Sequence, residues 1–223
     1  MFEYIGKKIL YVAPGGLRGF YTLGISTYIR ETYNLENYSL YGASAGAWNA
    51  LYLSYKNDSK TFLNNLDFIT KKKYSNLFEL QTNMKDNFSD IYTDDDFYIN
   101  NLNIYVTIFG INGFKKSLIS GFTELDDVMD CCIASSHIPL VSKPVLFQNY
   151  NNMLCVDGGM YNKLIDHNNH FLIPDICITP HMWNNDKIIK CDSLKTLDVL
   201  KLVEMGYNDS YKNRYWLDTK FNR

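Results

Sequence analysis

The sequence predicts an α/β fold with a largely parallel central sheet, in a single domain that covers residues 1–223. Two strand-and-helix units near the N-terminus lead to this prediction. Residues 9–13 form a short apolar run that ends at a proline and two glycines, and a helical pattern follows over residues 20–32. Residues 38–43 then lead into a second helix that starts at Ala45. Because crossovers between parallel strands are right-handed and short, the two strands should be near neighbours in one sheet.

Length and composition exclude several classes of protein. A chain of 223 residues with 46% hydrophobic residues can bury a sizeable core. Its net charge of −2 argues against a nucleic-acid partner, since such proteins carry a basic patch. Five cysteines without regular spacing fit neither a disulfide framework nor a zinc site, which indicates a reducing compartment. The N-terminus lacks the apolar core of a signal peptide and no stretch is apolar enough to span a bilayer, so we expect a cytoplasmic protein that is not secreted.

The stretch around Ser44 carries the strongest chemical signal. It reads Gly42-Ala43-Ser44-Ala45-Gly46, which matches the G-x-S-x-G nucleophile elbow, where the serine occupies a strained turn between strand and helix. The glycines let strand and helix pass closely, and the alanines keep bulk away from the hydroxyl. The positive end of the following helix would favour an alkoxide or oxyanion beside Ser44. The alternative interpretation is a tight turn that contains a serine with no catalytic role.

The glycine-rich loop at residues 14–19 joins a strand to a helix N-terminus, so its backbone amides could bind an anion. A nucleotide phosphate does not fit, because the loop matches neither G-x-G-x-x-G nor a P-loop. The oxyanion of an acyl-transfer intermediate fits, because the loop and Ser44 follow neighbouring strands. We therefore expect the amides of Gly15, Gly16 and Leu17 to form an oxyanion hole. The alternative is a loop that only allows close packing of helix on strand.

Asp157 is the candidate general base for Ser44. It follows an apolar strand and precedes Gly158 and Gly159, so its carboxylate should lie at the edge of the sheet with no bulk to screen it from a neighbour. The alternative is an ordinary Asp-Gly turn.

The other predicted elements carry less chemistry. Residues 59–73 have apolar side chains at helical spacing, which predicts one surface helix. Residues 74–100 are polar and acidic with little periodicity, which favours a flap or lid near the site. The three aspartates at 94–96 are expected to form a solvated turn or a helix start and not a metal site. We also expect strands at 104–109 and 116–119, a helix from a Thr123 cap to 135, a hairpin of 145–147 with 153–156, a strand at 175–179, and a C-terminal helix capped by Ser193 that buries Leu194, Leu197, Leu200, Val203 and Tyr207.

Taken together and in order, these motifs resemble the patatin-like phospholipase family, which includes plant patatins and the adipose-triglyceride-lipase group. Residues 15–19 are similar to the family's G-G-x-R-G oxyanion loop, with Gly24 further along the helix; residues 42–46 match its elbow, residues 157–159 its D-G-G/A motif, and residues 134–139 its A-S-x-x-x-P segment. The resemblance covers about residues 8–165, and a C-terminal strand and helix follow over about 175–215. Pro14 departs from the family, because it replaces a glycine and removes one amide, and residues 162–164 echo the family's Asn-x-Pro only faintly.

The resemblance implies a patatin-like three-layer α/β/α sandwich and a lipid acyl hydrolase of the phospholipase A, lysophospholipase or lipase type. Ser44 would be the nucleophile and Asp157 the general base of a catalytic dyad, with Gly15, Gly16 and Leu17 as the oxyanion hole. Arg18 would brace the loop by pairing with a carboxylate, or would be an ordinary surface arginine. No metal or cofactor is expected. The expected partner is a lipid or membrane-surface substrate (phospholipid, lysophospholipid or acylglycerol), at membranes or lipid droplets, and a protein activator stays open.

Three other functions remain open. An α/β-hydrolase-type esterase would use a triad of Ser44, Asp157 and one of three later histidines, namely His167, His170 or His181, although only one strand-and-helix unit precedes Ser44. A catalytically inactive patatin-fold protein would bind lipids or act as a scaffold. A second non-enzymatic option is membrane-surface binding alone, through the aromatic residues of 92–98.

Overall fold

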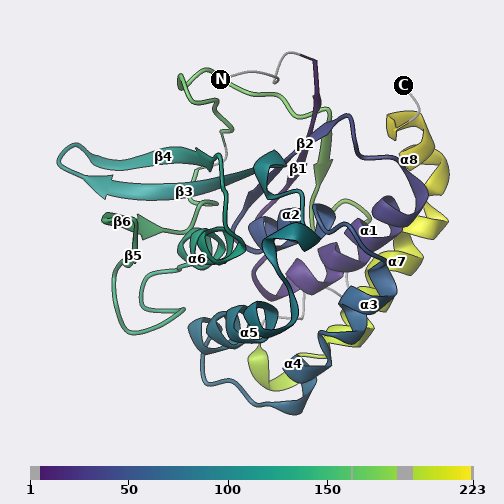
Figure 1. The fold of residues 1–223 in the computed structure, drawn as a ribbon, viewed down its shortest axis with the longest axis horizontal. Helices are drawn as coiled ribbons and strands as arrows, with labels where there is room; N and C mark the ends of the chain where they lie inside the picture. The colour runs from purple at the N-terminus through teal and green to yellow at the C-terminus, as the bar shows by residue number, and fades with distance from the viewer. Residues whose placement is uncertain (1–5, 162, 185–192, 222–223) are drawn as a thin grey trace.

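A seven-stranded mixed sheet forms the centre of the computed structural model, which describes residues 6–161, 163–184 and 193–221 (Figure 1). The strand order is β5-β6-β3-β2-β1-β7, and β4 pairs with the other edge of β3. The neighbours β3, β2, β1 and β7 run parallel, whereas β4 and β6 are antiparallel to β3 and β5 is antiparallel to β6. The strands are β1 (Lys8–Val12), β2 (Tyr38–Ala43), β3 (Leu102–Gly110), β4 (Gly113–Ser120), β5 (Gln148–Tyr150), β6 (Met153–Val156) and β7 (Ile176–Ile178).

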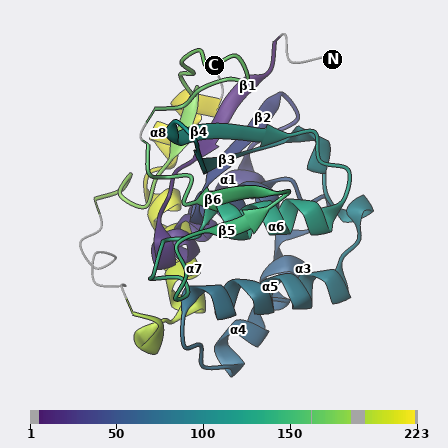
Figure 2. The ribbon, with the colours of Figure 1, turned by 90° about the vertical axis from the view of Figure 1, so that its left-hand side faces the viewer.

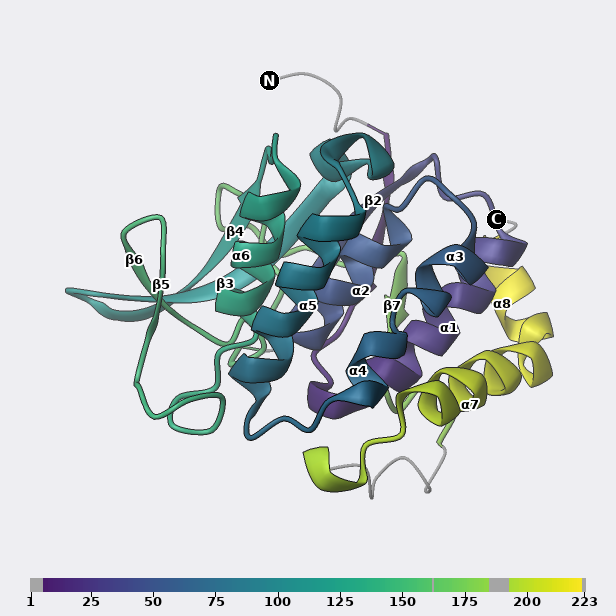
Figure 3. The same cartoon turned by 60° about the horizontal axis from the view of Figure 1, so that its bottom comes forward.

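The helices pack in layers against this sheet. In Figures 1 and 2, α6 lies between β3 and α5, and Figure 3 shows α5, α2 and α1 side by side. None of the helices that the structure describes has the length and apolarity that a membrane span requires. The α-helices are α1 (Gly19–Thr32), α2 (Ala45–Leu53), α3 (Ser59–Asn64), α4 (Asp67–Lys71), α5 (Leu77–Ile91), α6 (Leu125–Ser135), α7 (Val199–Lys212) and α8 (Arg214–Phe221), with 3₁₀ turns at Gly16–Arg18, Asp94–Asp96, Ile99–Asn101 and Leu194–Thr196.

Side-chain alternation divides the apolar residues of the sheet between two cores. On β1, Leu10 and Val12 belong to the main core together with residues of α1, α2 and α6. Tyr11 belongs to a smaller cluster with Tyr41 and Tyr105, against which Ile165 and Leu172 also pack. The predicted α/β class with a largely parallel central sheet is confirmed, although β4, β5 and β6 join the sheet by antiparallel pairing, and the layering is compatible with a three-layer sandwich.

Two predictions for residues 59–100 are wrong. The single helix expected at 59–73 is two short helices, α3 and α4, because the chain turns at Asn65 and Leu66 between them. The irregular flap expected at 74–100 contains the 15-residue helix α5. Its N-terminus is capped by the Asn76 side chain, which accepts a hydrogen bond from the Glu79 amide, and Leu80, Met84 and Phe88 repeat at helical spacing on its buried face.

The predicted helix starts, hairpin turn and buried face of the C-terminal helix also differ from the structure. The carboxylate of Asp94, and not Thr123, accepts the Leu125 amide at the start of α6. The hairpin turn is shorter than expected, because Asn151 and Asn152 both adopt the positive φ of a two-residue turn. Ser193 caps only a 3₁₀ turn, and α7 starts later, after Asp198. Its buried face is therefore different: Leu200 is exposed, and the buried residues are Val199, Leu202, Val203, Gly206 and Ser210.

Helices α1 and α7 approach each other through two glycines. A Cβ atom added to Gly24 would lie 1.9 Å from the Val203 carbonyl oxygen, and one added to Gly206 would lie 2.0 Å from the Tyr21 carbonyl oxygen. No side chain fits at either position unless a backbone moves. This contact fixes α1, whose N-terminal end carries the glycine-rich loop.

We predict that Gly24→Ala lowers the free energy of unfolding by about 2–3 kcal/mol, because the added methyl group forces the two helices apart. Urea denaturation measures the change. The matched control is Gly110→Ala, where no atom lies within 4 Å of the added Cβ. Equal stability of the two variants would contradict the close approach of α1 and α7.

Candidate active site

Ser44 occupies the sharp turn between β2 and α2. Its φ of 55° and ψ of −130° are strained for a residue with a side chain, as expected for a nucleophile elbow. The turn also needs small neighbours: a Cβ atom on Gly46 would lie 2.1 Å from the Val12 carbonyl oxygen, and one on Gly42 would lie 2.4 Å from the Gly46 carbonyl oxygen. The strain and the close packing place the Ser44 side chain directly at the N-terminus of α2.

Ser44 and Asp157 meet because two strands share one edge of β3 and run toward each other. Ala43, the last residue of β2, pairs with Tyr105, and Val156, the last residue of β6, pairs with Thr107. Strand β4 pairs with both Tyr105 and Thr107 from the opposite edge, so β2 and β6 must lie on the same edge. The residue that follows each strand therefore meets the other beside β3.

The two side chains are in direct contact. Ser44 Oγ donates a hydrogen bond of 2.6 Å to Asp157 Oδ2, and the Gly159 amide donates one of 2.7 Å to Asp157 Oδ1. Only 4% of Ser44 and 8% of Asp157 is exposed. A short bond from a buried hydroxyl to a buried carboxylate is the geometry required for direct proton transfer from serine to aspartate.

Ser135, the last residue of α6, holds both partners in place. Its Oγ accepts a hydrogen bond of 2.8 Å from the Ser44 amide and donates one of 2.6 Å to the Tyr105 carbonyl oxygen. Its own carbonyl oxygen accepts the Gly158 amide. The chain then continues to His137, whose carbonyl oxygen accepts the Asp157 amide. In the sequence, residues 134–139 stand out only through the family resemblance, which predicts no role for Ser135.

Opposing effects act on the Asp157 carboxyl. Burial raises its pKa, and the hydrogen bonds from Ser44 and Gly159 and the positive charge of Lys116 lower it. Lys116 lies on β4, opposite Thr107, and is only 7% exposed. Its Nζ donates a hydrogen bond of 2.6 Å to the Tyr161 carbonyl oxygen and lies 4.6 Å from the centre of the Tyr105 ring. Burial lowers the pKa of this amine to about 8.

Lys116 was missed by the sequence analysis. The only signal was a lysine at an inward-facing position of a predicted strand, where an apolar residue is usual.

Burial, and then the charges of Cys177 and Asp157, raise the pKa of Tyr11 on the same face of the sheet, so this phenol stays neutral.

The glycine-rich loop lies beside Ser44 as expected. Gly16 and Leu17 line the same pocket as Ser44, and Gly16 has a φ of 55°, in the left-handed region that favours glycine. Gly15 supports the turn, because its carbonyl oxygen accepts the Arg18 amide. Pro14 packs against Gly159, whose amide bonds Asp157: a Cβ atom on Gly159 would lie 2.4 Å from the Pro14 side chain.

Arg18 lies next to an imidazole. Its Nη1 is 3.3 Å from His181 Nε2, which ties the glycine-rich loop to the residues that follow β7. The other candidate histidines are engaged elsewhere: His167 Nε2 is 3.0 Å from Ser120 Oγ, and His170 Nδ1 is 3.2 Å from Asp166. No histidine ring lies between Ser44 and Asp157, which bond directly.

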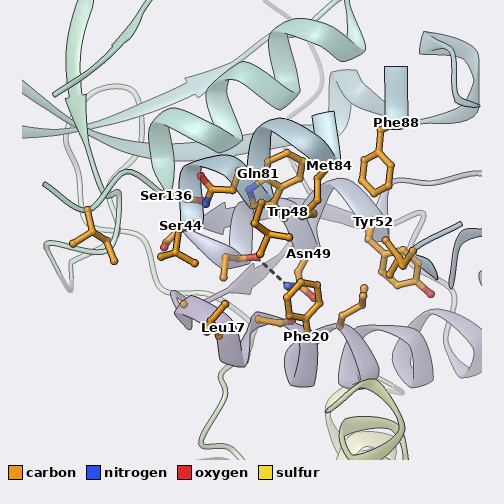
Figure 4. A pocket seen from close by; sticks show the side chains of 18 of the residues that line it. Leu17, Phe20, Ser44, Trp48, Asn49, Tyr52, Gln81, Met84, Phe88 and Ser136 are labelled. Carbon is orange, nitrogen blue, oxygen red and sulfur yellow. Dashed lines mark hydrogen bonds between the residues drawn. The ribbon is translucent and has the colours of Figure 1, made fainter. Parts of the chain in front are cut away.

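An apolar pocket starts at Ser44 and enters the helical layer between α1, α2 and α5. Figure 4 shows Ser44 and Ser136 at one end and Tyr52 and Phe88 at the other. The empty space within and at the mouth of this pocket is about 730 Å³, counting the part open to solvent. Its walls are mostly aromatic and aliphatic, including Leu17, Phe20, Leu23, Leu80 and Met84.

The aspartates at 94–96 serve the fold. Asp94 caps α6, and Asp96 accepts the amide of Thr93 in a capping box, which agrees with the expected helix start. Within the residues that the structure describes, no three His, Cys, Asp or Glu side chains are grouped so that they could hold a metal ion. Asn162, which belongs to the faint Asn-x-Pro match, lies outside the described residues.

We predict that Ser135→Ala lowers the free energy of unfolding by about 1–3 kcal/mol, because it leaves the buried Tyr105 carbonyl and Ser44 amide without their shared partner. Urea denaturation measures this loss. The matched control is Ser136→Ala, since the Ser136 hydroxyl bonds only the carbonyl oxygen four residues back in its own helix. A larger loss at Ser136 than at Ser135 would contradict the role assigned to Ser135.

No protein-family model matches this chain, and no curated protein matches it.

Proposed function

We propose that this protein is a serine carboxylic-ester hydrolase that cleaves fatty-acyl esters of lipids through a Ser44–Asp157 dyad. The observation that carries the proposal is the 2.6 Å hydrogen bond from the nucleophile-elbow serine to a buried aspartate, with no imidazole between them. Burial raises the pKa of the Asp157 carboxyl, which makes it a stronger base toward the serine hydroxyl.

The proposed reaction has two half-reactions. In the first, Asp157 takes the Ser44 proton as Oγ attacks the ester carbonyl carbon, and the carbonyl electron pair moves to oxygen. The tetrahedral intermediate then releases the alcohol, which leaves with the proton held by Asp157. In the second, water gives a proton to Asp157 and attacks the acyl carbon, and Ser44 leaves with that proton as the fatty acid forms.

The charge that develops on the carbonyl oxygen needs preorganised donors. The amides of Gly16 and Leu17, at the pocket wall beside Ser44, suit this role, and Gly15 and Arg18 support their loop. The N-terminus of α2 begins directly after Ser44 and adds a favourable dipole.

A lipid is the substrate class that best suits the pocket. An acyl chain would pack against the apolar walls of the pocket, whereas the polar groups of a polar metabolite would lack hydrogen-bond partners there. The ordered motifs and this site together support membership of the patatin-like family, with its three-layer α/β/α fold. Phospholipids, lysophospholipids and acylglycerols, met at a cytoplasmic membrane or lipid-droplet surface, are the proposed substrates.

The competing functions have less support. A Ser-Asp-His triad would need a histidine at Asp157, but His167, His170 and His181 have other partners. A membrane surface formed by the aromatic residues of 92–98 loses support because Tyr92 and Phe97 are buried. An inactive scaffold does not need a strained serine held against a buried carboxylate.

We predict that Ser44→Ala and Asp157→Asn each lower kcat/KM for lipid esters by at least roughly a thousandfold, because one removes the nucleophile and the other the proton acceptor. Fatty-acid release from phospholipids, lysophospholipids and triacylglycerols measures the loss. His167→Ala and His170→Ala are the controls and should keep most of the activity. Loss of activity in either histidine variant would favour the triad, and a folded but inactive wild type would favour the scaffold.

We predict that Lys116→Met shifts the acid limb of the kcat/KM profile to higher pH. Asp157 must be ionised to act as a base, so activity is lost as the pH falls through its pKa. Because the Lys116 charge lowers that pKa, its removal makes the loss begin at a higher pH. The matched control is Lys115→Met, an exposed neighbour on β4. Identical profiles for the two variants would show that Lys116 has no electrostatic effect on the base.

A further inference from the structure

The depth of the pocket beside Ser44 follows from the length of α2 that runs along its wall. The residues of α2 that line the pocket are Ala45, Trp48, Asn49 and Tyr52, which follow one face of the helix over two turns. At 1.5 Å per residue, the distance from Ala45 to Tyr52 along the helix axis is about 10 Å. Helix α5 runs along the opposite wall in the same direction, from Gln81 near Ser44 to Phe88 at the far end (Figure 4).

The far end of the pocket is closed by packed aromatic rings. Phe62 lies 4.7 Å from Tyr52 and 5.4 Å from Phe88, measured between ring centres. Tyr55 and Tyr92 pack behind Phe62, at 5.3 and 5.7 Å. All five rings are buried, so a chain in the pocket meets a wall here and has no path to solvent.

Two polar atoms of the pocket that lack a partner belong to residues nearer to Ser44. Gln81 Oε1 and Trp48 Nε1 are buried without a hydrogen-bond partner, and Figure 4 places both residues between Ser44 and the aromatic end. A buried polar atom without a partner is costly. The ester end of a substrate would therefore lie beside these two polar groups, and the remainder of its chain would contact mostly apolar walls.

We propose that the site acts on esters of straight, medium-length acyl chains, and that Phe62 and Phe88 set the longest chain it accepts. An extended chain advances about 1.2 Å per bond, so a depth of about 10 Å holds roughly eight to ten carbon atoms. This inference rests on the proposed hydrolase function, and it predicts a higher kcat/KM for caprate esters than for palmitate esters.

The test is a series of p-nitrophenyl esters from butyrate to palmitate. For the wild type, kcat/KM should rise by up to about fourfold per methylene as far as caprate and should fall for palmitate. Phe88→Leu and Phe62→Leu, which shorten the closing rings, should move the optimum to longer chains. Met84→Phe, which narrows the middle of the pocket, should move it to shorter chains. The ratio of variant to wild type for one ester cancels differences in ester solubility.

The matched control is Phe97→Leu. Phe97 is equally buried and packs on the same aromatic cluster, 5.2 Å from Tyr55 and 5.5 Å from Tyr92, but it does not line the pocket. It should keep the wild-type optimum. If palmitate is the best substrate of the wild type, or if Phe97→Leu moves the optimum as far as Phe88→Leu does, the length limit is wrong while the hydrolase function stands.

A binding experiment separates this inference from the proposed function. Decanoic acid should raise the melting temperature of Ser44→Ala, and palmitic acid should do so only in Ser44→Ala/Phe88→Leu. Binding with this selectivity in a protein whose wild type cleaves no ester would support the pocket limit and reject the hydrolase. Equal binding of both acids by Ser44→Ala would overturn the limit.

Discussion

The site depends on one constraint of the sheet: β2 and β6 share a single edge of β3 and end against each other. Because Ala43 pairs with Tyr105 and Val156 with Thr107, only the level of Val106 separates the two strand ends. A parallel strand followed by an antiparallel one on the same edge is unusual in a doubly wound sheet, where the carboxyl ends of neighbouring strands lie side by side. Here it brings Ser44 and Asp157, 113 residues apart in sequence, within one hydrogen bond.

This meeting has an electrostatic cost that neighbouring elements offset. A carboxylate as buried as Asp157 favours the protonated form, in which it could not accept the serine proton. The Gly159 amide and Ser44 hydroxyl each stabilise the charged form, and Lys116 adds a cation from β4, on the other edge of β3. The burial that raises the pKa of Asp157 is therefore offset in part by the hairpin of β3 and β4, which supplies the opposing charge.

The sequence predicted the features that are encoded locally. The elbow at 42–46 and the glycine-rich loop can be read from consecutive residues, because steric demands on a turn select small residues at fixed spacing. The ends of β2 and β6 meet because of strand pairing, which no local pattern specifies. The contact between Ser44 and Asp157 could therefore be predicted only from the order of the motifs. Ser135 and Lys116 act through contacts between distant segments, and α5 was missed because its apolar residues are spread among many polar ones.

The missed helix places the proposed selectivity of the site in a different part of the fold from its proposed chemistry. Ser44 and Asp157 follow strand ends beside β3, where backbone pairing fixes their positions. The pocket that would choose the acyl chain lies in the helical layer, between α2 and the face of α5 that carries Leu80, Met84 and Phe88. Substitutions on α5 change the depth and width of the pocket and leave the strand pairing of the dyad intact. The chain length accepted can therefore change without disturbing the bond between Ser44 and Asp157.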